Sequence, residues 1–215
     1  MNRVLKDKAI FIADAHYPNR SKELLSFLEA LKRNPPPQLF LMGDIFDILI
    51  GGYENFKREN LKLIELINSL SPYCEIFYFE GNHDFNLSKL FKNVELFSIK
   101  NQPQIFYYND KKFLLSHGDK SFSFSYWLYS KIIRNRFTLF LLKPFGDIIL
   151  KLVDKRQQKK RLCKKIDNFY SLVKKRAKRD FILVEGHFHQ GEIFDNYIAL
   201  PAFACNNSYA VFKGG

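Results

Sequence analysis

The histidines of this chain are the residues whose placement most clearly indicates chemistry. There are five in 215 residues, and each lies in a short segment that also holds aspartate, asparagine or glycine. Together with one Gly-Asp segment, these form five motifs: Asp14-Ala15-His16, Gly43-Asp44-Ile45-Phe46-Asp47, Gly81-Asn82-His83-Asp84, His117-Gly118-Asp119 and Gly186-His187-Phe188-His189. Histidines scattered through a core or over a surface would not all fall in such motifs, so the set indicates one shared site.

The residue types in these motifs are typical ligands of divalent metal ions. Carboxylates, imidazoles and an amide oxygen suit Mn²⁺, Fe²⁺, Zn²⁺ or Mg²⁺ better than a thiolate-preferring metal, and no cysteine lies in any motif. Enzymes with two such ions activate a water molecule and neutralise phosphate oxygens between the metals. We therefore expect two divalent ions, with Mn²⁺ favoured and Mg²⁺, Fe²⁺ or Zn²⁺ as alternatives.

The elements that must position these motifs alternate between strand and helix. Apolar runs predict buried strands, and apolar residues at helical spacing predict helices between them. The expected strands of the first half cover 10–12, 39–42 and 76–79, and the expected helices cover 21–31 and 60–70. This order indicates an α/β fold, in which residues just past the strand ends converge on one crevice. Short strands near 105–108, 113–115, 181–184, 192–194 and 197–200 predict a second, partly antiparallel sheet.

Residues 121–179 interrupt this alternation and carry most of the positive charge. Between residues 131 and 179 there are 17 Lys/Arg and 3 Asp/Glu, which gives +14, whereas the rest holds 17 and 19, which gives −2. Aromatic, apolar and basic stretches follow one another, and Leu162, Ile166, Phe169 and Leu172 keep helical spacing. We interpret the chain as a single domain over 1–215 with a helical cap inserted at about 121–179.

Other features of the sequence bear on location. Cys74, Cys163 and Cys205 are far apart and form no metal-binding pair, which favours free thiols in a reducing compartment. The amino terminus lacks the pattern of a signal peptide, and no apolar stretch reaches the ~18 residues needed to span a bilayer. We expect a cytoplasmic protein. The net charge of +12 favours anionic partners, either a membrane surface or nucleic acid.

Taken in order, the five motifs resemble those of the calcineurin-like metallophosphoesterase superfamily, from Asp14 to His189. The resemblance implies a two-sheet α/β sandwich and a metal-dependent hydrolase. It implies that one metal is held by Asp14, His16, Asp44 and His189, and the other by Asp44, Asn82, His117 and His187. It further implies that His83 acts in catalysis, that Asp84 supports it by orienting His83, and that Asn82 and His83 contact the substrate. Asp47 and Asp119 are candidates for supporting roles.

The layout of the insertion is similar to that of the UDP-2,3-diacylglucosamine pyrophosphate hydrolases of lipid A biosynthesis. In that family a helical insertion caps the metal site and receives acyl chains. The resemblance implies an amphiphilic nucleotide-sugar lipid as substrate, cleavage to UMP and 2,3-diacylglucosamine 1-phosphate, and peripheral binding to the inner face of the cytoplasmic membrane. Arg134 and Arg136 in the insertion are candidate substrate-binding residues by location.

Alternative functions follow from the same residues. The best-known branch of that family has arginine where this chain has His83, so the chain is either a divergent branch or another nucleotide pyrophosphatase. A metal-dependent nuclease or other phosphodiesterase would use the basic insertion to bind a phosphate backbone. A non-catalytic scaffold with the same fold is a further alternative, although such a protein would be expected to lose ligands. The sequence makes no prediction of the oligomeric state.

Overall fold

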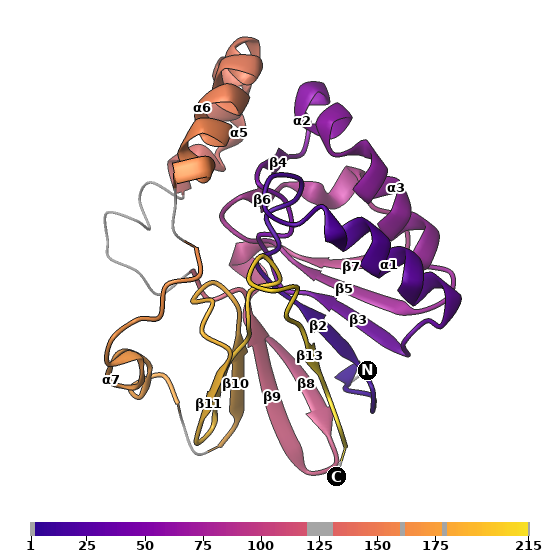
Figure 1. Ribbon diagram of the computed structural model, residues 1–215, viewed down its shortest axis with the longest axis vertical. Coiled ribbons are helices and arrows are strands. Elements are labelled where there is room, and N and C mark those ends of the chain that lie inside the picture. The colour runs from indigo at the N-terminus through magenta and orange to yellow at the C-terminus, as the bar shows by residue number, and fades with distance from the viewer. Residues whose placement is uncertain (1–2, 120–130, 160–161, 178–179, 215) are drawn as a thin grey trace.

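Two mixed β-sheets packed against each other form the body of the protein (Figure 1). The structure is a computed structural model that describes residues 3–119, 131–159, 162–177 and 180–214. The first sheet has the order β13 (Ala210–Val211), β2 (Ile10–Ile12), β3 (Gln38–Leu41), β5 (Glu75–Phe79) and β7 (Val94–Phe97). The second has the order β1 (Arg3–Val4), β8 (Gln104–Tyr108), β9 (Lys111–Ser116), β10 (Ile182–Glu185), β12 (Tyr197–Ala199) and β11 (Glu192–Phe194). The predicted two-sheet α/β sandwich is confirmed.

Alternation along the strands of the first sheet divides its side chains between two cores. Phe11, Phe40 and Phe77 point toward the second sheet, and the ring of Phe40 lies 4.4 Å from Phe11 and 4.9 Å from Phe77, centroid to centroid. The ring of Phe106 in the second sheet meets Phe40 edge-on at 5.1 Å. Neighbouring residues such as Leu41 point the other way, as expected from the two-residue period of a strand.

Helices cover the outer face of the first sheet. The helices α1 (Glu23–Arg33), α2 (Glu54–Glu59) and α3 (Leu61–Leu70) bury Leu24, Leu28 and Phe56, among others, in the core that lies there. Two short 3₁₀ helices, η1 (Leu87–Lys89) and η2 (Ile99–Asn101), and the two-stranded sheet of β4 (Leu49–Ile50) and β6 (Asp84–Phe85) complete this half. The parallel order of β2, β3 and β5 places their carboxyl ends on one edge.

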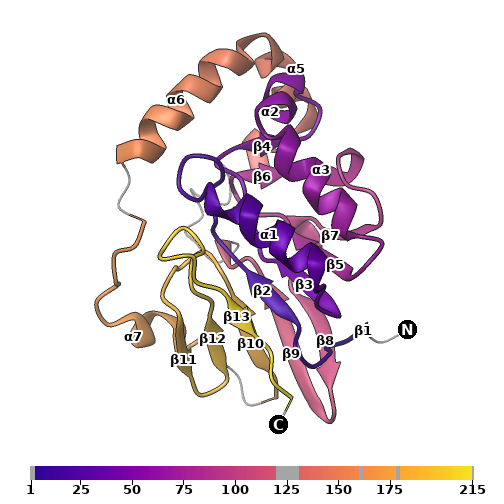
Figure 2. The ribbon, with the colours of Figure 1, turned by 45° about the vertical axis from the view of Figure 1, so that its right-hand side comes forward.

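The described part of the insertion is a helical arm followed by a short helix. Helix α5 (Arg136–Leu142), the 3₁₀ turn η4 (Lys143–Phe145) and α6 (Gly146–Lys159) form the arm, which stands beyond the sheets next to α2 (Figures 1 and 2). The Tyr53 hydroxyl donates to the Leu139 carbonyl, and the Asn55 amide donates to Asp147 at 3.1 Å, so α2 holds the arm. Among the residues described, none of the helices has the length and apolar character needed to cross a membrane.

The helical spacing of apolar residues between Leu162 and Leu172 predicts a longer helix than the structure has in that segment. Only α7 (Phe169–Val173) is helical there, and Asn168 before it has a left-handed backbone with φ of 54°. The side chain of Gln190 accepts from the Ile166 amide at 3.0 Å, and Lys165 reaches the Gln190 carbonyl at 2.5 Å. These contacts to the loop after β10 hold residues 162–168 in a non-helical path, which a spacing rule does not detect.

Candidate metal centre

The predicted ligands converge at the carboxyl ends of five strands. Asp14 and His16 follow β2, Asp44 follows β3, and Asn82 follows β5, three neighbouring strands of the first sheet. His117 follows β9, and His187 and His189 follow β10, which are neighbours in the second sheet. The carboxylate and imidazole ligand atoms, together with His83, fall into overlapping clusters, and within each cluster the atoms lie within 4.8 Å of one another. The site therefore spans the junction of the two sheets.

Five of these residues have a left-handed backbone conformation, which residues other than glycine rarely adopt. They are Asp14, His16, Asp44, His187 and His189, with φ between 50° and 60°. Each left-handed residue costs free energy, and such residues cluster at functional sites because the surrounding structure compels them. Here the turn after each strand directs a side chain into the crevice. Eight further non-glycine residues of the described chain also have a positive φ, so this strain is not confined to the site, but five of the residues that bear it are candidate ligands.

The first cluster contains Asp14, His16 and His189. The Nε2 atom of His189 lies 3.1 Å from the Oδ1 atom of Asp14. The Nδ1 atom of His189 donates to the Leu162 carbonyl at 2.9 Å, which fixes the ring with Nε2 toward the centre. Because the Leu162 contact involves the main chain, no residue type in the sequence indicated it. The insertion therefore helps to orient a candidate metal ligand.

The second cluster contains Asp44, His117 and His187. The Nε2 atom of His117 lies 3.6 Å from the Oδ2 atom of Asp44 and 3.2 Å from the Nδ1 atom of His187. The Nδ1 atom of His117 donates to the Met42 carbonyl at 2.8 Å, so its Nε2 atom faces the centre. Asp44 also belongs to a cluster with His16 and His83 and so lies between the two halves of the site.

Buried polar atoms at the centre fit a role as metal ligands. Both ring nitrogens of His16 and the Oδ1 atom of Asn82 are buried without a hydrogen-bond partner among the described residues. Buried polar groups are almost always paired, because leaving one without a partner costs about 1–3 kcal/mol. Imidazole nitrogen and amide oxygen are both suitable donors to Mn²⁺, Zn²⁺ or Fe²⁺. The residues present therefore fit a pair of divalent ions.

The electrostatics of the centre also favour a cation. Burial raises the pKa of the Asp44 carboxyl, but the facing His117 and His83 outweigh it and hold that pKa well below its usual range. Burial and the neighbouring His83 lower the pKa of His16 to about 3, and burial and His117 lower that of His187 to about 4. At neutral pH the centre thus presents an ionised carboxylate beside the neutral imidazoles of His16 and His187. Despite their burial, Asp44 raises the pKa of His117 well above its usual range and Asp14 raises that of His189, so a metal ion would have to displace protons from these two rings.

The side chains of His83 and Asp84 each have other hydrogen-bond partners, although Asp84 was predicted to orient His83. The Nδ1 atom of His83 donates to the Asp47 carbonyl at 2.7 Å, and its ring meets that of His16 edge-on at 5.1 Å. Asp84 is fully buried and accepts from the Tyr78 hydroxyl at 2.6 Å. It also accepts from the backbone amides of Asp44, Ile45, Phe46 and Gly81. Asp84 therefore shapes the loop that carries Asp44, while the ring of His83 is held by Asp47.

A cavity of about 610 Å³ opens beside the centre. Asp44, Asn82, His187 and His189 line one part of it, and residues of the insertion line another. The insertion contributes Leu162, Lys164, Lys165, Ile166, Asp167 and Leu172. The cavity therefore joins candidate metal ligands to a wall that is both cationic and apolar.

Arg134 connects the insertion to two of the motifs. Its guanidinium donates to the Gly81 carbonyl at 2.8 Å and to Asp119 at 3.3 Å, and it lies over the ring of Phe85. It thus lies next to Asn82 and supports the third and fourth motifs, and its predicted contact with substrate stays a prediction. The side chain of Arg136, the other candidate, lies outside the described side chains.

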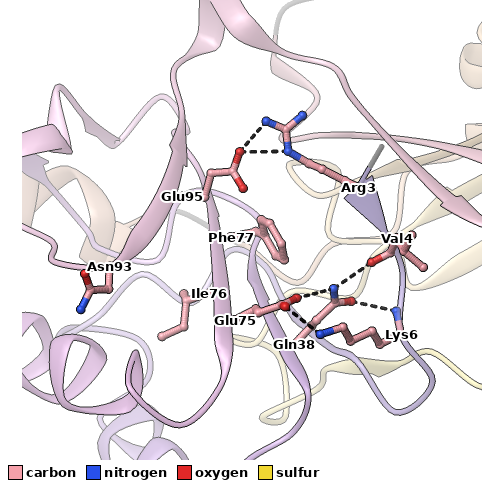
Figure 3. Close-up of a pocket in the computed structure, with 9 residues that line it drawn as sticks. All are labelled: Arg3, Val4, Lys6, Gln38, Glu75, Ile76, Phe77, Asn93 and Glu95. Atoms are coloured by element: carbon pink, nitrogen blue, oxygen red, sulfur yellow. Dashed lines mark hydrogen bonds and ion pairs between the residues drawn. The ribbon is translucent and has the colours of Figure 1, made fainter. Parts of the chain in front are cut away.

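A second cavity, of about 480 Å³, is lined by residues of the opposite strand ends (Figure 3). Arg3 pairs there with Glu95, and the Nζ atom of Lys6 lies 2.7 Å from Glu75. Gln38 donates to Glu75 at 2.9 Å and to the Val4 carbonyl at 2.9 Å, as the close-up shows. These interactions connect β1 to the first sheet, and both basic side chains are paired with glutamates. The cavity beside the metal ligands is therefore the better candidate for an anionic substrate.

Gly81 is required because its backbone touches Asp44. A Cβ atom at Gly81 would lie 2.3 Å from the Oδ1 atom of Asp44 and 2.6 Å from the Asp44 amide. Gly81→Ala should displace this carboxylate and lower kcat/KM by roughly 10²-fold, because small displacements at an active site cost that much. The measurement is hydrolysis of a soluble phosphodiester beside metal content. Gly52→Ala is the control, since φ there is +94° but nothing lies within 4 Å; equal loss in both variants would contradict the explanation.

The prediction that all three cysteines are free thiols is wrong for two of them. Cys163 and Cys205 form a disulfide with a Cα–Cα distance of 5.7 Å, and Cys74 is free and buried. Their separation of 42 residues gave no signal in the sequence. The bridge ties the segment next to Leu162 to the loop whose Ala204 amide donates to the Asp14 carbonyl at 3.2 Å. It therefore links the surroundings of two residues of the first cluster.

Loss of this disulfide should lower the stability of the folded protein by a measurable amount. Replacing both Cys163 and Cys205 with serine should lower the free energy of unfolding by about 2–4 kcal/mol, because the bridge restricts the unfolded chain. Denaturant unfolding of the oxidised protein and the double variant gives this difference. Thiol titration of the unreduced, unfolded protein should detect Cys74 alone; three reactive thiols would contradict the bridge.

Comparison with known proteins agrees with the geometry of the centre. The family model for calcineurin-like phosphoesterases matches residues 8–209. A UDP-2,3-diacylglucosamine hydrolase from Histophilus somni (strain 2336) is 26% identical over 207 residues, covering 88% of this chain and 87% of the relative. One from Haemophilus influenzae (strain PittGG) is 27% identical over 199 residues, covering 85% and 83%. The chain therefore belongs to the calcineurin-like phosphoesterase family and is a metal-dependent hydrolase.

Proposed function

We propose that this protein cleaves the pyrophosphate of UDP-2,3-diacylglucosamine, giving UMP and 2,3-diacylglucosamine 1-phosphate. The observation that carries the proposal is the cavity of about 610 Å³ in which metal-ligand candidates share space with Lys164, Ile166 and Leu172. A substrate with a charged pyrophosphate and two acyl chains needs both kinds of surface. The relatives named for this activity align with more than four-fifths of the chain.

The proposed site assigns a role to each motif. One metal would be held by Asp14, His16, Asp44 and His189, and the other by Asp44, Asn82, His117 and His187. Bound ions, Mn²⁺ in our proposal, would supply Lewis-acid chemistry and an activated water. His83, whose Nδ1 atom is hydrogen-bonded to the Asp47 carbonyl, would act on substrate oxygens through its Nε2 atom. Lys164 on the cavity wall would neutralise substrate phosphate.

The location that we propose follows from the substrate. An amphiphilic nucleotide sugar resides in a bilayer, so we propose that the protein acts at the inner face of the cytoplasmic membrane as a peripheral protein. The basic insertion supports this, since basic residues near an anionic surface contribute about 1 kcal/mol each. Nucleic acid is the competing anionic partner.

The test is release of UMP from UDP-2,3-diacylglucosamine in the presence of Mn²⁺. UDP-N-acetylglucosamine and a short DNA duplex are the comparison substrates, and a chelator is the control for metal dependence. Chelator-sensitive release from the diacylated substrate alone is the expected result. Cleavage of either comparison substrate without release from the diacylated one would contradict the proposed substrate and move the enzyme to another nucleotide-sugar or nucleic-acid class.

A further inference from the structure

The arm formed by α5, η4 and α6 has two apolar faces, and only one of them is covered. Leu139 is buried on the inner face, where Ile149, Leu150 and Val153 pack against the main core. The outer face exposes six large apolar side chains, each with more than half of its surface accessible. They are Phe137, Phe140, Leu141, Phe145, Ile148 and Leu152. We call this set the arm stripe.

Part of the arm stripe lies on one side of α6. Ile148 and Leu152 are four residues apart in that helix and so share one side of it, whereas Leu141 and Phe145 belong to α5 and η4. Monomeric soluble proteins rarely expose contiguous apolar patches of this kind without a partner. The arm itself lies beyond the sheets, at an extremity of the molecule (Figure 2). The position and composition both indicate a surface that meets a partner.

Basic residues accompany the arm stripe and define the chemistry of that partner. Lys151 lies three residues after Ile148, and Lys155 lies three residues after Leu152, so both are on the same side of α6 and exposed. Residues 136–159 hold six Lys/Arg and two Asp, which gives +4. The Asp147 carboxylate accepts from the Asn55 side chain at 3.1 Å and is thereby turned toward α2.

We propose that the arm stripe is the surface with which this protein binds an anionic lipid bilayer. Apolar side chains would enter the boundary between headgroups and acyl chains, and the lysines would contact anionic headgroups, as in interfacial amphipathic helices. A second copy of the chain fits less well, because two stripes packed together would bring their lysines together. A phosphate backbone would match the lysines but leave the aromatic and aliphatic side chains exposed to water.

This proposal deepens the membrane association proposed above and rests on it for the choice of a lipid partner. It does not depend on catalysis, so binding can be measured in the full chain whatever substrate it cleaves. The arm also borders the element that lines the cavity, since the insertion continues from α6 toward Leu162 and Lys164. Docking by this surface would place the cavity near the bilayer that holds an amphiphilic substrate.

The experiment is co-sedimentation of the full-length protein with vesicles of phosphatidylcholine containing one-third phosphatidylglycerol, beside vesicles of phosphatidylcholine alone. Ile148→Gln combined with Leu152→Gln should reduce partition into the anionic vesicles roughly a hundredfold, because each buried aliphatic side chain contributes a factor of about ten or more. Lys151→Gln combined with Lys155→Gln should reduce it roughly 25-fold, a factor of about five for each charge. At high salt the Lys151/Lys155 variant should bind like the unchanged protein, whereas the Ile148/Leu152 variant should still bind more weakly.

Matched controls come from elsewhere on the surface. Ile193→Gln replaces an aliphatic side chain that is 73% exposed on β11, and Lys62→Gln replaces an exposed lysine of α3. Both should bind vesicles like the unchanged protein, and all variants should hydrolyse a soluble phosphodiester at the same rate. Equal binding by the Ile148/Leu152 variant and the unchanged protein would overturn the proposal. So would a dimer in solution that this variant converts to a monomer, since the stripe would then bind a second copy.

Discussion

Asp44→Asn should reduce kcat/KM by at least ~10³-fold, which corresponds to about 4 kcal/mol of lost transition-state stabilisation. The carboxylate is 3% exposed, and its Oδ2 atom lies 3.6 Å from the Nε2 atom of His117. Its Oδ1 atom accepts from the His83 amide at 2.9 Å, so asparagine can keep this hydrogen bond and the shape of the side chain. What asparagine lacks is the negative charge between two groups of candidate ligands, on which a pair of divalent ions would depend.

Metal content and activity together test the position of Asp44. We expect the unchanged protein to hold two ions per chain after equilibration with Mn²⁺, and the Asp44→Asn variant to hold fewer. Asp110→Asn, an exposed aspartate in the turn between β8 and β9, is the control and should leave both measurements unchanged. Two ions per chain and full activity in Asp44→Asn would contradict a bridging role. Thermal unfolding of the metal-free proteins shows whether the fold is intact.

The sequence predicted the convergence of the motifs because strand ends impose it. Once Ile10–Ile12, Gln38–Leu41 and Glu75–Phe79 are parallel neighbours, the residues just after them must share an edge. Apolar runs identify such strands without any knowledge of the pairing. The two-residue strand Ala210–Val211 and the short helix Glu54–Glu59 carry too few residues for a periodic signal, and neither was predicted.

The sequence did not predict the contacts that main-chain atoms make, or those between residues far apart in the sequence. The carbonyls of Met42 and Leu162 orient His117 and His189, and a carbonyl carries no signature in the residue type. The disulfide between Cys163 and Cys205 depends on the fold bringing two remote segments together. Asp84 was predicted to orient a neighbour in sequence, whereas its buried carboxylate serves the backbone of a different loop. Residue types identified the site, but tertiary structure determined how it is supported.

His83→Ala should leave the metal content unchanged and lower kcat by roughly 10²–10⁴-fold, the range typical of a lost general acid or base. The ring is partly exposed and directed by the Asp47 carbonyl, and its ligand atom also lies within 4.8 Å of those of His16 and Asp44. The ring could therefore act on substrate or bind a metal. Metal analysis of the variant distinguishes these roles, because a ligand's removal would release an ion whereas a catalytic group's removal would not.

His83→Arg separates two ways in which the side chain could act on the substrate. Arginine keeps its charge throughout the accessible pH range and cannot deliver a proton, but it can stabilise charge on phosphate oxygens. If His83 stabilises charge, the arginine variant should recover most of the activity lost in His83→Ala. If His83 protonates the leaving oxygen, the arginine variant should be as slow as the alanine variant. Either result, with the metal content retained, places His83 at the substrate; full activity in His83→Ala would remove it from the mechanism.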